Sequence, residues 1–253
     1  MLIRILLVAC LVQCSYASET LEPEDSQFSR EFLGGYTHLV LSYLSSAYED
    51  DVKVRLIGFP SFSPEYSLGI KETEGEFSIF YESPKIQLWG YQMMPVMEHG
   101  AVQIMNDDGE FVKDEEGLKE LESQYPKDPL DIPRVSCNVK IDKDLANHIV
   151  YVWQEMLYET KYSREPTMGM DGETYHFSAK MWGNVNYAGK VWSPPSESKT
   201  GELVSISELM TEYCLNEKKK TKNTLINKAK ELHETLKSTN KSSKRDAASG
   251  TPS

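Results

Sequence analysis

Turn-favouring residues divide much of this chain into short segments in which apolar and polar side chains alternate. Alternation of this kind places every second side chain on one face of a β-strand. Glu74 with Gly75, and the run 106–109, each separate two such segments by a few residues, as in a β-hairpin. The chain is therefore expected to form an antiparallel sheet, with strands at residues 52–57, 66–70, 77–81, 86–91, 101–105, 110–112, 135–141, 174–181 and 188–192.

Apolar residues spaced three and four apart predict helices packed on one side of this sheet. The strongest pattern follows Asp142, a residue type that caps helices. Ser205 with Glu208 has the spacing of a capping box, and Gly34 with Gly35 interrupts an earlier helical stretch. We expect the α+β fold class, with helices at residues 28–47, 115–125 (capped by Asp114), 142–157 and 205–213, and a basic helical or disordered C-terminal tail.

The mature chain is long enough for one large domain or two small ones. We expect a globular α+β domain over residues 27–215, followed by a basic tail over residues 216–253. Prolines are concentrated at residues 126–133, so this stretch can divide the domain into lobes at 27–126 and 133–215.

Charge differs between the body and the tail. Residues 1–215 hold 17 basic and 35 acidic side chains, whereas residues 216–253 hold 10 basic and 4 acidic. An acidic body lacks the basic footprint that phosphate binding needs, so nucleic acid is not an expected partner. The basic run 218–245 has three interpretations: it binds an anionic surface, it folds back on the acidic body, or it is a solvated helix without a partner.

The N-terminus has the three parts of a secretory signal peptide. Arg4 precedes an apolar run, and a small-residue pattern ends at Ala17. We therefore expect residues 1–17 to be removed and the protein to act in the periplasm or outside the cell. The alternative is a lipoprotein anchored at Cys10, because residues 7–10 also fit a lipoprotein cleavage pattern. The apolar run is too short to span a bilayer, and no transmembrane segment is expected later in the chain.

Cleavage of the signal peptide would leave two of the four cysteines, Cys137 and Cys214. Two cysteines in an exported protein are most simply explained by a disulfide. A reactive thiol is the alternative, and it would need a nearby base.

His176 is the candidate catalytic residue, with Asp171 or Glu173 as an orienting carboxylate. Strand alternation places Tyr175 and Phe177 on a core face and His176 on the opposite face. A general base with a carboxylate partner can be built there, and so can an ordinary solvent-facing strand.

The other histidines match no metalloprotease spacing. His148 follows Asp144 by one helical turn, and such a pair can share a metal ion, but no third ligand is supplied by pattern. The expected state of His148 is a solvated helix edge, and that of His233 is a solvated tail residue. No metal or cofactor is therefore predicted.

Aromatic residues near turns are the candidate partner-binding residues. Exposed aromatic rings beside polar groups can bind sugars or a protein. The candidates are Trp182, Tyr187 and Trp192, with Trp89 and Tyr91 as further turn-proximal aromatics.

Several short motifs in residues 135–215 resemble a group of exported bacterial proteins without an assigned activity. The motifs are residues 153–157, 160–162, 171–172 and 174–178, Gly189, residues 192–194 and 203–204, and Tyr213 with Cys214. The resemblance implies a bacterial origin and an envelope or extracellular location, and it implies no activity. The expected function is non-enzymatic binding of a protein or glycan partner, and the alternative is a hydrolase-like enzyme centred on His176.

Overall fold

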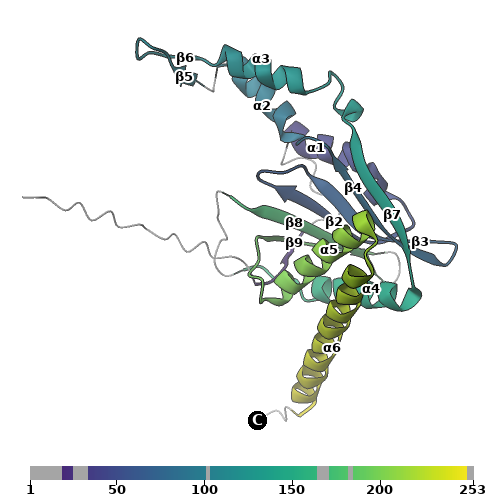
Figure 1. The fold of residues 1–253 in the computed structure, drawn as a ribbon. Helices are drawn as coiled ribbons and strands as arrows, with labels where there is room; N and C mark the ends of the chain where they lie inside the picture. The colour runs from purple at the N-terminus through teal and green to yellow at the C-terminus, as the bar shows by residue number, and fades with distance from the viewer. Residues whose placement is uncertain (1–18, 25–33, 101–102, 164–170, 182–184, 250–253) are drawn as a thin grey trace, which may run out of the picture.

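The computed structural model describes residues 19–24, 34–100, 103–163, 171–181 and 185–249 (Figure 1). Side chains are described up to residue 239. The predicted signal peptide, the lipoprotein cysteine Cys10 and Trp182 lie outside these residues. No helix within the described ranges is both long and apolar enough to cross a bilayer.

An antiparallel sheet of seven strands forms the centre of the molecule, as alternation predicted. Strands from both sides of the proline-rich stretch pair within this one sheet, because β7 pairs with β4 and β8 with β2. In spatial order the strands are β1 (Glu22–Pro23), β9 (Asn186–Trp192), β8 (Glu173–Lys180), β2 (Val52–Pro60), β3 (Tyr66–Thr73), β4 (Glu76–Pro84) and β7 (Arg134–Ile141).

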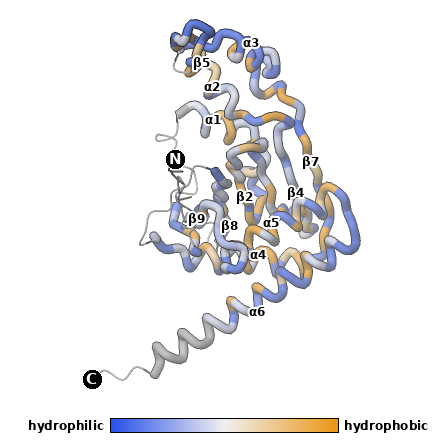
Figure 2. Tube along the Cα trace, turned by 60° about the vertical axis from the view of Figure 1, so that its left-hand side comes forward, coloured by the Kyte–Doolittle hydropathy of each residue, from blue (hydrophilic) through white to orange (hydrophobic). Residues whose placement is uncertain are grey.

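Hairpin turns lie where turn residues predicted them. Glu74 (φ 53°) and Gly75 (φ 83°) form the turn between β3 and β4, and two consecutive positive φ angles match the twist of adjacent strands. A second hairpin joins β5 (Gln103–Met105) to β6 (Phe111–Lys113) outside the main sheet. Figure 1 shows this hairpin on an arm that projects from the sheet, and Figure 2 shows that α3, which is mostly hydrophilic, belongs to the same arm.

Helices cover both faces of the sheet, and not one side as expected. One apolar core packs α4, α5 and α6 against the sheet, and a second packs α1 and η1 against the opposite face. The helices are α1 (Gly34–Tyr43), α2 (Trp89–Glu98), α3 (Glu115–Gln124), α4 (Lys143–Tyr158), α5 (Lys199–Asn216) and α6 (Lys219–Ser249), with 3₁₀ turns η1 (Ser45–Tyr48) and η2 (Pro129–Asp131).

Helix α4 confirms the strongest helical prediction. The Asp142 carboxylate accepts a hydrogen bond from the Leu145 N–H at 2.9 Å, which caps the helix. Its apolar stripe is buried, and burial of each large side chain contributes roughly 1.5–3 kcal/mol. The stripe consists of Leu145, Ile149, Val152, Trp153, Met156 and Leu157.

Two local predictions were wrong. Residues 86–91 were expected to form a strand, but the chain enters α2 at Trp89 after the Leu88 N–H donates to the buried Glu65 carboxylate at 2.8 Å. The fourth predicted helix was expected to start near Ser205, but α5 begins at Lys199 because Ser198 caps it by accepting from the Gly201 N–H at 3.0 Å. The capping-box pattern therefore falls inside the helix.

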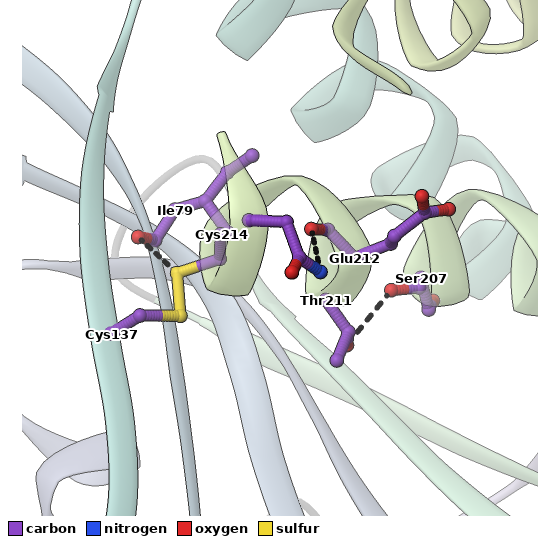
Figure 3. Close-up of a disulfide and its surroundings, with 7 residues drawn as sticks. Ile79, Cys137, Ser207, Thr211, Glu212 and Cys214 are labelled. Carbon is purple, nitrogen blue, oxygen red and sulfur yellow. Dashed lines mark hydrogen bonds between the residues drawn. A yellow bond between two sulfur atoms is a disulfide. The ribbon is translucent and has the colours of Figure 1, made fainter. Parts of the chain in front are cut away.

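The predicted disulfide joins β7 to α5 (Figure 3). The Cys137 and Cys214 Sγ atoms are 2.07 Å apart and their Cα atoms 5.8 Å apart. Cys214 Sγ also lies 3.6 Å from the Ile79 carbonyl oxygen of β4. The bond therefore ties the last strand of the sheet to a helix that covers its face.

Helix α6 folds back on the body, which is one of the three interpretations of the basic tail. Four of its apolar residues are buried in the same core as the sheet: Leu225, Ala229, Leu232 and Leu236. Lys222 pairs with Asp142 at 3.2 Å, at the start of α4. The packed body therefore continues past residue 215, and the far end of α6 projects from it (Figure 1).

Candidate functional site

His176 lies on β8 and forms a hydrogen bond with a carboxylate that its local sequence did not indicate. Its Nδ1 is 2.6 Å from Oε2 of Glu24, and the two side chains are only 11% and 14% exposed. Phe59 on the adjacent strand β2 contacts the imidazole edge-on, with ring centroids 5.1 Å apart. His176 is therefore a covered, paired side chain and not a solvated strand residue.

Glu24 reaches His176 because the N-terminal segment adds a strand to the sheet. Glu22 and Pro23 form β1 and pair with β9, and the Glu24 N–H donates to the Ala188 carbonyl at 3.1 Å. Ala188 is on β9, between β1 and the strand that carries His176. The N-terminal segment is therefore paired with the sheet at residues 22–24.

The predicted carboxylate partners are not brought to His176. Alternation along β8 places Glu173 on the opposite face, where it interacts with the hydroxyls of Tyr66 and Tyr175. Burial raises the pKa of the Glu173 carboxyl, the two hydroxyls lower it, and the charge of Glu208 on α5 raises it. Asp171 precedes the strand and is exposed.

Tyr187 is exposed, and it lines an open groove at the edge of the sheet. The groove has a volume of about 550 Å³ and runs between the end of α4 and strand β9, which is second from the edge of the sheet. We call it the edge groove and define it by its lining residues: Glu24, Leu157, Tyr158, Thr160, Asn186, Tyr187 and Ala188.

Two tyrosines form the aromatic part of the edge groove. Tyr158 is 71% exposed and Tyr187 is 38% exposed. Their rings are nearly parallel, at 17°, with centroids 6.3 Å apart. Sequence reasoning missed Tyr158 because it directly follows the buried stripe of α4. Its position off that stripe, at the end of the helix, was the available signal.

Trp192, the other described partner-binding candidate, is not on this surface. It is half-buried, and a Cβ placed on Gly172 would come within 2.9 Å of its ring. The ring therefore packs against the turn that precedes β8. Among the predicted aromatic residues that the structure describes, Tyr187 is the one that lies in the edge groove.

His148 and His233 contact each other across α4 and α6, which corrects both predictions of solvated residues. His233 is 9% exposed. In the described part of the chain, no three His, Cys, Asp or Glu side chains converge as ligands for a metal ion.

Comparison with known proteins gives no relative from which a function can be carried over. No family model matches the chain, and neither a curated protein nor a solved structure matches it.

Proposed function

We propose that the protein is an exported glycan-binding protein and that the edge groove is its binding site. The parallel pair Tyr158 and Tyr187 carries this proposal, because both rings are exposed and both line the same groove. Sugars combine apolar C–H faces with a rim of hydroxyl groups. Flat aromatic side chains cover the first, and hydrogen-bonding side chains satisfy the second.

The remaining lining residues supply that hydrogen-bonding chemistry. Asn186 contributes an amide and Thr160 a hydroxyl, and Glu24, whose carboxylate is bonded to His176, also lines the groove. A small number of polar groups beside an aromatic surface is typical of a site that binds a small molecule. A hot spot for binding a protein is instead centred on anchor side chains that become fully desolvated in the complex. This groove is open to solvent, which favours a glycan over a protein partner.

Co-sedimentation with insoluble polysaccharides tests the proposal. The probes are peptidoglycan sacculi, chitin and cellulose. We expect the protein to be retained on at least one of them and the Tyr158→Ala/Tyr187→Ala variant to bind it about tenfold more weakly, which corresponds to about 1.4 kcal/mol. Phe62→Ala is the matched control, because Phe62 is 81% exposed and lies outside the groove.

Retention on none of the probes, or equal retention of the double variant, would overturn the proposal. Capture of a protein from an envelope fraction that depends on the same two tyrosines would assign the groove to a protein partner instead. Circular dichroism of each variant checks that the fold is intact.

The hydrogen bond between His176 and Glu24 favours one second candidate, a hydrolase with His176 as general base. A carboxylate bonded to one ring nitrogen orients the imidazole and fixes its tautomer. Glu24 takes the role that was expected of Asp171 or Glu173. For a polysaccharide that binds, release of reducing ends by the native protein and its loss in His176→Gln, with binding kept, would support the enzyme; no release at all would refute it.

A further inference from the structure

A histidine pair holds α6 against α4. Nδ1 of His148 lies 2.8 Å from Nδ1 of His233, although the two residues are 85 positions apart. The His233 ring stacks on Tyr151 of α4, with centroids 3.9 Å apart and planes at 15°. The contact is thus part of the helix–helix interface.

This contact limits the number of protons that the pair can carry. A neutral imidazole has one N–H and one lone pair, whereas an imidazolium has an N–H on both nitrogens. A 2.8 Å contact between two Nδ1 atoms needs a hydrogen on one and a lone pair on the other. Protonation of both rings would place two hydrogens and two positive charges face to face, so the contact would be lost.

Charged groups of both α4 and α6 surround the pair, and two of them oppose a positive charge on His233. On α4, Asp144 Oδ2 lies 3.8 Å from Nε2 of His148. On α6, Lys230 approaches the same carboxylate at 3.5 Å, and Lys237 lies over the Tyr151 ring. The charges of three further carboxylates raise the pKa of His233 or of Tyr151. They are Glu234 of α6, Glu155 of α4 and Glu159 at the C-cap of α4.

His233 is poorly placed to become charged. Burial lowers the pKa of its imidazole, the charges of Lys237 and His148 lower it further, and Glu234 raises it. Its Nε2 is shielded from solvent and has no hydrogen-bond partner among the described residues. A proton on this nitrogen would be a buried donor without an acceptor, which is unfavourable.

We propose that His148 and His233 form a pH-sensitive latch, which keeps the outer part of α6 docked on α4 until both rings are protonated. Because folding lowers the proton affinity of His233, docking is fully stabilised above the ordinary histidine pKa of about 6.5. That stabilisation is lost as the pH falls through the lowered pKa of His233.

Release is confined to one end of the helix. Leu225 is buried near the start of α6, and Lys222 pairs with Asp142 there, so this end stays attached. His233 lies one turn before Leu236, the last buried residue described on α6. Release would therefore begin beyond Leu232 and uncover the apolar edge of α4 beneath it.

Hydrogen exchange of the full chain, read by mass spectrometry at pH 7.5 and pH 5.5, tests the latch. After correction for the intrinsic pH dependence of exchange, we expect protection of residues 229–239 to fall at least tenfold at pH 5.5. Peptides from α5 should keep theirs. His233→Gln should abolish the response, because an amide carries a donor and an acceptor at both pH values.

His38→Gln is the matched control, since His38 is exposed on α1, and it should leave the response unchanged. Lys237→Gln changes an exposed end of the latch and should move the midpoint of release to higher pH, because a charge that opposes protonation of His233 is removed. Equal protection at both pH values, or a pH response that persists in His233→Gln, or an unmoved midpoint in Lys237→Gln, would overturn the latch.

Discussion

Loss of the Cys137–Cys214 disulfide is expected to lower the free energy of unfolding by about 4.5 kcal/mol. The two cysteines are 77 residues apart in sequence. In the chain-entropy model, closing a loop of that length removes about 15 cal/mol/K from the unfolded state, which is about 4.5 kcal/mol at 298 K. The effect acts on the unfolded chain, so it should exceed what the contacts of the two sulfur atoms would contribute.

Urea unfolding of Cys137→Ala/Cys214→Ala against the oxidised native chain measures this difference. The unfolded chain without the cross-link is more expanded, so the dependence of stability on urea should also become steeper. The reduced native protein is the control, because it keeps both side chains and lacks only the bond. A loss below about 1 kcal/mol in both samples would refute the entropic reasoning.

Three further changes test the packing, the caps and the close contacts. Leu232→Ala should cost about 2–5 kcal/mol in urea unfolding, since this α6 residue is fully buried; a value near zero would return α6 to a solvated tail. The Leu145 N–H is the main cause that lowers the pKa of Asp142, so the cap stabilises the fold above about pH 4 and the effect fades as the pH falls through the lowered pKa. The difference in stability between the native chain and Asp142→Ala, about 1 kcal/mol at pH 7, should shrink on acidification. Gly69→Ala should cost about 1–3 kcal/mol in thermal unfolding, because a Cβ there would come within 2.0 Å of a backbone carbonyl oxygen of β2; Gly35→Ala, which meets nothing within 4 Å, should cost nothing.

Elements with strong local signals were predicted from the sequence. The Asp142 cap and the apolar stripe that follows it both predict a helix that starts at the same position, and α4 starts there. Glu74 with Gly75 supplies the backbone freedom that a two-residue turn requires, and the β3–β4 hairpin follows. In each case the information lies within a few neighbouring residues.

Features that depend on distant segments were not predicted. Ser198 competes with Ser205 as the start of α5, and only the packing of the intervening residues decides between them. The partner of His176 is Glu24, 152 residues away, and that of His148 is 85 residues away. No feature of their local sequences indicates these partners. The two contacts can be identified only when the strand order of the sheet and the packing of α6 on α4 are known.

The short strand β1 has a consequence for the order in which the molecule assembles. Residues 22–23 are made well before residues 189 and 190 of β9, with which they pair. During synthesis at about 5–20 residues per second, β1 would wait roughly 10–30 seconds for β9 to be made. The edge of the sheet therefore closes late, and Glu24 is among the last residues of the edge groove to reach its place. A nascent chain stalled before β9 would hold a folded β2–β3–β4 hairpin pair but no complete groove.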